Sequence, residues 1–207
     1  MRSPKGGCPW DLEQNHKSIR FYSVEEAYEL IDAIEADDDH EMVEELGDLL
    51  LQVIFHSQMA SERGAFDFAE VCRREVDKLV SRHPHVFGNK KLHTAEGVLA
   101  QWEHLKRAEK KGTRYERPSV LDGIPKRLPS LLRAQKLLKK ARKGKLLDKR
   151  PRKTRMGKAE IGKKLFDLVE VAQDQGVTAE ELLRSEIRRR ERELRRRERQ
   201  MQENSGN

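Results

Sequence analysis

The 207-residue sequence predicts an all-α fold, a helical bundle followed by a basic helical extension. Apolar residues recur with helical spacing through nearly the whole chain, which favours helices over strands. Short polar turns with capping residues and glycines separate these segments. Three long helices and a fourth, joined in this way, are typical of an antiparallel bundle.

The first predicted helix follows an irregular lead-in over residues 1–17, where Pro9 and two glycines disfavour regular structure. Ser18 is the expected N-cap of a helix that runs to about residue 36. Three aspartates then form a turn with capping capacity. The second helix is predicted over residues 40–63, ending at Gly64 as a C-cap.

The next two helices complete the predicted bundle. Asp67 is the expected N-cap of the third helix, which must stop before Pro84 because proline disfavours a helical residue ahead of it. A fourth helix is predicted to start at Thr94 and to reach about residue 111. Beyond Gly112, a basic helix is predicted over residues 130–143 and a linker over residues 149–158.

Charge divides the chain into two halves. Residues 1–112 hold 15 Lys and Arg against 22 Asp and Glu, whereas residues 113–207 hold 28 against 14. The net charge of +7 therefore combines about −7 with +14. We divide the chain into an N-terminal helical domain (1–112), a linker with a basic helix (113–150) and a C-terminal segment (151–207). Such asymmetry indicates an electrostatic partner for the basic half, or docking on the acidic half.

Two predicted helices each carry a pair of acids one turn apart. Glu26 and Glu29 form the first pair, and Glu45 and Asp48 the second. Residues three apart share one face of a helix, so each pair presents its oxygens to a common point. Four converging carboxylates form a site for a hard cation, Mg²⁺ rather than zinc. A lone pair of this kind is usually a solvated face, but the second pair lies on an otherwise apolar, hence buried, helix.

Packing the two helices within one chain does not obviously join the two acid pairs. The apolar residues of the first helix lie on the side away from its acids. We therefore expect a second subunit to complete the core, and the protein to be a homodimer.

The chain resembles the MazG family of nucleoside triphosphate pyrophosphohydrolases over roughly residues 6–143. The resemblance is carried by seven motifs in order: Cys8-Pro9-Trp10-Asp11, the two acidic motifs, Arg82 to Gly88, Trp102-Glu103-x-x-Lys106, Ser119 to Gly123, and Leu131 to Lys136. It implies a MazG-like bundle of the all-α NTP pyrophosphatase type and Mg²⁺-dependent hydrolysis of nucleoside triphosphates to nucleoside monophosphate and pyrophosphate.

The resemblance also implies roles for eight residues. The catalytic, metal-binding set is Glu26, Glu29, Glu45 and Asp48, and the substrate-binding set is Lys78, Arg82, Trp102 and Lys106. The two cations on the third helix stand four residues apart and would bind phosphates. The indole would stack on the base and the lysine reach a phosphate; without the resemblance, the same tryptophan reads as a core residue.

The C-terminal segment contains a weak internal repeat. Residues 159–166 align with residues 44–51, and Gly176 follows as Gly64 does. Family members of the longer type carry two such domains in tandem, so we interpret this segment as a degenerate second repeat. Lys163 stands where the acid Asp48 stands in the first copy, so the second copy is not expected to bind metal.

The basic tail leaves two alternatives open. Residues 188–199 contain eight arginines and three glutamates, a pattern that favours a solvated or intramolecularly docked helix over nucleic-acid binding because no aromatics interleave. The alternative functions are a non-catalytic nucleic-acid-associated protein that uses Arg188–Arg199, and a pyrophosphohydrolase restricted to one nucleotide.

Two features of the sequence bear on location. Cys8 and Cys72 give neither zinc spacing nor a disulfide framework, and no apolar run approaches the length of a membrane span. We expect a cytoplasmic protein without a membrane partner.

Overall fold

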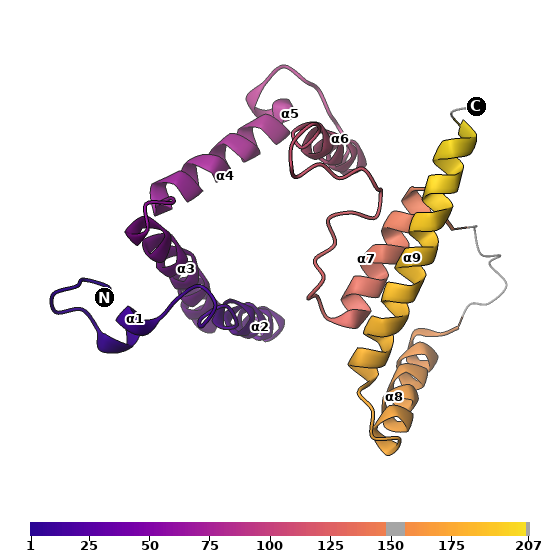
Figure 1. Ribbon diagram of the computed structural model, residues 1–207, viewed down its shortest axis with the longest axis horizontal. Coiled ribbons are helices and arrows are strands. Elements are labelled where there is room, and N and C mark those ends of the chain that lie inside the picture. The colour runs from indigo at the N-terminus through magenta and orange to yellow at the C-terminus, as the bar shows by residue number, and fades with distance from the viewer. Residues whose placement is uncertain (148–155, 206–207) are drawn as a thin grey trace. The chain divides into compact units, whose positions relative to one another are not determined.

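The computed structural model describes residues 1–147 and 156–205 (Figure 1). Every regular element in these residues is a helix, which confirms the all-α prediction. The helices are α1 (Pro9–Glu13), α2 (Tyr22–Glu35), α3 (Asp39–Glu62), α4 (Phe68–Arg82), α5 (Pro84–Phe87), α6 (Ala95–Ala108), α7 (Ser130–Lys143), α8 (Lys158–Asp174) and α9 (Ala179–Ser205). The predicted linker lies mostly outside the described residues.

The chain divides into two compact units, an N-terminal unit, Met1–Leu105, and a C-terminal unit, Lys106–Asn207. Within the described residues, no helix combines the length and the apolar character needed to cross a membrane.

The N-terminal unit is built on the antiparallel pair α2 and α3 (Figure 1). Asp38 caps α3 by accepting hydrogen bonds from the backbone N–H groups of His40 and Glu41, as the capping turn predicts. A small core of Ile19, Phe55 and Met59 holds the lead-in against α3. The packing of α2 against α3 therefore fixes which face of each acidic helix is turned toward the other.

Two local predictions for the lead-in were wrong. Residues Pro9–Glu13 form the short helix α1, with proline in the first turn, where its missing N–H costs nothing. Ser18 does not cap α2, which begins at Tyr22 after Phe21. Its hydroxyl instead donates to the carbonyl oxygen of Asn15 and accepts from the backbone N–H of the same residue, so the preceding turn has used its capping capacity.

The ends of α4 follow the sequence signals. Asp67 accepts a hydrogen bond from the N–H of Glu70 at the start of the helix. At its end, the ring Nδ1 of His83 lies 2.7 Å from the carbonyl oxygen of Leu79, so this histidine closes the last turn before Pro84 begins α5. Figure 1 shows α4 leading away from the end of α3 instead of folding back along α2.

In the C-terminal unit, the arginine-rich helix α9 packs along α7 (Figure 1). The core of this unit consists of Leu121, Leu137, Ala141, Leu146, Ile187 and Leu194. At its edge, Glu198 is 7% exposed and accepts hydrogen bonds from the Ser119 hydroxyl and the Val120 N–H. One face of α9 is therefore docked within the chain.

The turns after α3 and α8 close in the same way. Gly64 and Gly176 both have φ of +68°, a left-handed conformation that glycine adopts without steric cost. In each turn the next N–H reaches back five residues, Ala65 to Ala60 and Val177 to Ala172, at 3.0 Å. Both accepting alanines are buried. Asp37 after α2 and Lys145 after α7 take the same left-handed conformation before a similar closing hydrogen bond, so this closure is a general end of the helices in this chain.

Candidate functional site

Carboxylates from α2 and α3 converge on one point. Glu26, Glu45 and Asp48 each offer an oxygen, and these oxygens all lie within 4.8 Å of one another. All three side chains are half-buried between the two helices. The Gln52 amide, one turn further along α3, donates to Glu26 over 3.4 Å. Glu45, Asp48 and Gln52 therefore form a polar strip on α3 that faces Glu26 of α2.

Within one chain, α2 and α3 bring Glu26 of the first acid pair to both acids of the second pair, which the apolar pattern did not indicate. Glu26 of α2 faces Glu45 and Asp48 of α3, while many apolar residues of both helices, among them Val24, Ile31, Leu46 and Leu50, are exposed. Helices that are apolar on several sides can pack in more than one rotation, and the sequence pattern alone does not choose between them.

The four predicted acids repel one another electrostatically. Burial raises the pKa of Glu26, and Asp48 and Glu29 raise it further. Burial, then Glu29 and Asp48, raise the pKa of Glu45 in the same direction. Glu29 is thus coupled to the cluster, although it is more exposed than the other three acids. Charge repulsion of this kind favours binding of a proton or a cation.

One oxygen of the cluster is buried without a partner. Glu45 Oε2 accepts no hydrogen bond from any residue that the structure describes. A buried carboxylate oxygen without a donor is costly unless a proton or metal satisfies it. An all-oxygen set of three or four carboxylates suits Mg²⁺, which binds through a few carboxylates and retains water.

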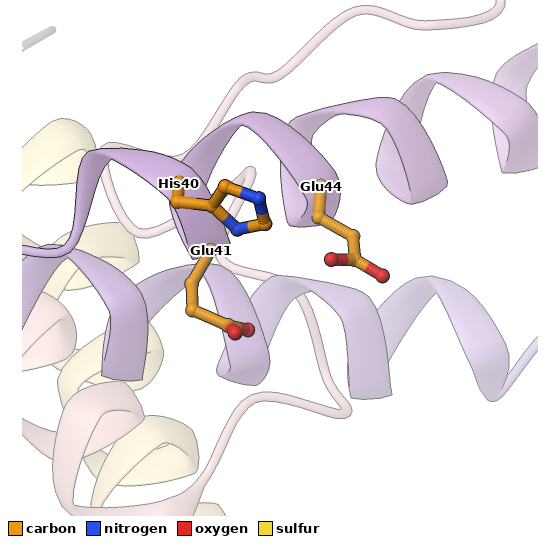
Figure 2. Close-up of side chains that lie close together, drawn as sticks. All are labelled: His40, Glu41 and Glu44. Atoms are coloured by element: carbon orange, nitrogen blue, oxygen red, sulfur yellow. The ribbon is translucent and has the colours of Figure 1, made fainter.

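A second group of possible ligands lies on the first turns of α3. His40, Glu41 and Glu44 approach one another but are all exposed (Figure 2). Exposed acids near a helix N-terminus stabilise the helix dipole without any ion, so we assign this group no ligand. Glu44, which neighbours Glu45 on the same helix, therefore serves as a control position for substitutions in the carboxylate cluster.

The predicted substrate-binding residues lie on α4 and α6. The Arg82 guanidinium carbon lies 5.3 Å from the centroid of the Trp102 ring, and Arg82 is only 7% exposed. Lys78 stands one turn earlier on α4 and pairs with Glu75. Lys106 follows Trp102 by one turn of α6. The structure thus joins Arg82 to Trp102, which the sequence spacing does not reveal.

The carboxylates and this cationic group come from different parts of the N-terminal unit. Helix α4 packs against α3 and α5, and in the described residues it makes no packing contact with α2. Lys78 and Arg82 lie in the second half of α4. In the part of the chain that the structure describes, the predicted substrate-binding cations of α4 therefore lie on a helix that does not pack against α2, which carries Glu26.

The sequence did not predict a histidine pair beside the core of this unit. His16 in the lead-in and His56 on α3 approach through their Nδ1 atoms at 2.8 Å, with ring planes only 4° apart. Ring centroids 5.1 Å apart at this contact mean that the rings meet edge to edge, so one Nδ1 donates to the other. Burial, together with His16, lowers the pKa of His56. Forty residues separate the two histidines, so no local pattern marks them.

Comparisons with known proteins agree with the geometry. A family model described as the MazG nucleotide pyrophosphohydrolase domain matches residues 14–87, which contain the whole carboxylate cluster, Lys78 and Arg82. The nucleoside triphosphate pyrophosphohydrolase of Escherichia coli K12 is 47% identical over 140 residues, 68% of this chain and 52% of that protein.

Two further relatives extend the comparison. The nucleoside triphosphate pyrophosphohydrolase/pyrophosphatase MazG of Thermotoga maritima is 43% identical over 141 residues, 68% of this chain and 52% of that protein. An uncharacterized 26.1 kDa protein of Streptomyces cacaoi is 42% identical over 180 residues, 86% of this chain and 71% of that protein. The chain thus spans about half the length of the named pyrophosphohydrolases.

Proposed function

This chain belongs to the MazG nucleotide pyrophosphohydrolase family, and on that premise we propose that it hydrolyses nucleoside triphosphates to nucleoside monophosphate and pyrophosphate with Mg²⁺. The observation that carries the proposal is the cluster of Glu26, Glu45 and Asp48, with a buried oxygen of Glu45 that lacks a partner among the described residues. The relatives whose names state this activity are 47% and 43% identical to the chain over 140 and 141 residues.

The residues of the cluster hold the metal in this proposal. Glu26, Glu45 and Asp48, with Glu29 beside them, supply the oxygens, and bound Mg²⁺ offsets charge that builds on the phosphate oxygens. A carboxylate of the cluster outside the metal's ligand set accepts a proton from the attacking water.

We propose that a second copy completes each site. Helix α3 exposes an apolar seam of Val43, Leu46, Leu50 and Val53, spaced three and four residues apart. Helix α2 adds Val24, Tyr28 and Ile31 with the same spacing. Exposed seams with this periodicity pair with other helices. Pairing of two copies would cover these seams and can bring Lys78 and Arg82 of one copy to the carboxylates of the other.

A substrate panel tests the proposed reaction. The full chain is incubated with each ribonucleoside and deoxyribonucleoside triphosphate, with Mg²⁺ or with a chelator, and pyrophosphate and monophosphate are measured. Equal amounts of both products, formed only with Mg²⁺, support the proposal. Release of orthophosphate and a diphosphate would contradict it, because attack would then fall on another phosphorus.

We expect the cationic pair to act in substrate binding. Arg82→Ala removes a charged hydrogen bond to phosphate, which costs about 1.5–3 kcal/mol and therefore raises KM by roughly ten- to a hundredfold. Trp102→Ala should also raise KM, by a similar factor for every base. Loss of base stacking costs about 1–3 kcal/mol and does not depend on which base is stacked. Arg73→Ala is the matched control, because Arg73 is exposed on the same helix and pairs with Glu70. A loss confined to one base would assign Trp102 to a discriminating pocket.

Metal binding by the cluster should also change the Tm of the protein, which can be measured without any turnover. The folded protein binds protons at Glu26 and Glu45 more tightly than the unfolded chain, because their pKa is raised. Their contribution to stability is full below the unfolded pKa of about 4.3 and is lost as pH rises through the raised pKa. Without metal, we expect Glu45→Gln to have a higher Tm than wild type at neutral pH.

Two comparisons test this signature. The Tm difference between Glu45→Gln and wild type should shrink toward about pH 4, where Glu45 of the wild type is protonated as well. Mg²⁺ should raise the Tm of wild type and raise that of the variant much less. An equal Mg²⁺-induced rise in both proteins would remove Glu45 from the metal site.

A further inference from the structure

A basic groove lies in the C-terminal unit, between residues 126–133 and helix α9. Its volume is about 1120 Å³. Seven cationic and three carboxylate side chains line it, which leaves a net charge of +4, and no aromatic residue takes part. The groove lies within one unit, so its walls do not depend on how the two units are placed.

Three of its arginines hold the walls together. Arg184 on α9 donates to the carbonyl oxygens of Lys126 and Leu128, at 2.9 and 3.2 Å. Arg195 donates to Asp122 at 2.8 Å, and Arg133 on α7 donates to Glu191 at 2.6 Å. These contacts fix the two sides of the groove relative to each other.

Two of the three carboxylates are also engaged in the fold. Glu180 accepts from the backbone and hydroxyl of Ser130, and Glu191 accepts from Arg133 and Arg195. Arg133 itself is only 7% exposed, and its Nε lacks an acceptor in the described part of the chain. Glu180 and Glu191 therefore hold the walls of the groove together, and the Nε of Arg133 remains available as a donor to a ligand.

Four cations are left for a ligand. Lys126 and Arg127 lie on one wall, and Arg188 and Arg192 on α9 face them from the other. None of the four pairs with a carboxylate within residues 1–147 and 156–205. Arg189 and Arg190, by contrast, lie on another face of α9 and are neutralised by Glu186 and Glu193. Four of the seven cations of the groove thus lack a carboxylate partner among the described residues.

We propose that this groove binds a run of phosphates, such as a nucleic-acid backbone, without reading the bases. Guanidinium groups bind phosphate oxygens through paired hydrogen bonds, which favours phosphate over other anions. The arginines extend from Arg184 to Arg195, about 16 Å along the helix, which exceeds a single triphosphate. The absence of aromatic residues from the lining excludes base stacking.

Fluorescence anisotropy of the full chain with a labelled mixed-sequence single-stranded RNA tests the proposal. We expect binding at low salt, with a slope of log K against log salt of about −3 for four phosphate contacts. Arg188→Ala with Arg192→Ala should lower the affinity at least tenfold and halve the slope. Arg189→Ala with Arg190→Ala removes the same charge from the same helix and should change the affinity less than twofold. Circular dichroism checks that α9 remains helical in both variants.

Competition separates the two sources of a phosphate chain. Displacement of the RNA by an unlabelled oligonucleotide of another sequence at equal phosphate concentration, but not by inorganic polyphosphate, identifies a nucleic-acid backbone. Stronger displacement by polyphosphate identifies the inorganic polymer, and the groove remains a phosphate-chain site. No binding of either probe at low salt, or equal losses in the two double variants, would overturn the proposal.

Discussion

Glu45→Gln is expected to lower kcat/KM by at least about a hundredfold, because it removes a metal oxygen and leaves an amide of nearly the same shape. Metal-assisted stabilisation of phosphate charge contributes several kcal/mol, and each 1.36 kcal/mol is a factor of ten in rate. Glu45 is the sharpest choice within the cluster because its Oε2 is buried and finds no donor among the described residues.

Glu44→Gln is the matched control for this experiment. Glu44 is the neighbouring residue on α3 and is exposed in the group with His40 and Glu41 (Figure 2). The same change of charge at this position should leave kcat/KM within about twofold, since surface charges interact weakly through water. Steady-state pyrophosphate release at saturating Mg²⁺ measures both variants. Similar losses at the two positions would mean that general acidity of this surface, and not the cluster, supports turnover.

The second large effect is expected from Leu50→Glu, which should convert a dimer into an inactive monomer. Leu50 is 50% exposed in the middle of the apolar seam of α3. Burial of a leucine side chain contributes about 1.5–3 kcal/mol, and a glutamate in its place must also be desolvated. Each dimer contains the change twice because both copies supply the same face. Leu99→Glu, at a 65% exposed leucine on α6, is the control.

Sedimentation and subunit mixing measure this prediction. Wild type and Leu99→Glu should sediment as dimers, and Leu50→Glu as a monomer without turnover. Mixing two impaired variants, Glu45→Gln and Arg82→Ala, at a substrate concentration far below the KM of Arg82→Ala then tests whether copies share a site. About one quarter of wild-type turnover should return, since half of the dimers are mixed and each of these holds one intact site. A fully active wild-type monomer, or no recovery on mixing, would confine the site to one chain.

The sequence alone determined the helices of the bundle and the ends that carry strong local signals. Asp38 and Asp67 cap α3 and α4 as their positions predict, and Gly64 lies in the left-handed turn after α3. Such signals act between residues that are close in sequence, so a short segment of the sequence contains all the interacting groups. The acid pairs, one turn apart, were visible for the same reason. Ser18 does not cap α2 because its hydroxyl is hydrogen-bonded to the backbone of Asn15 in the preceding turn.

Tertiary structure decided which of these local features meet. The convergence of Glu26 with Glu45 and Asp48, and the contact of His16 with His56, depend on how α2, α3 and the lead-in are rotated against one another. Helix α9 packs on α7 across a long stretch of sequence, and the arginines of α9 line a groove only because of that packing. An amphipathic pattern fixes the buried face of a helix but not its partner, because apolar burial is not directional.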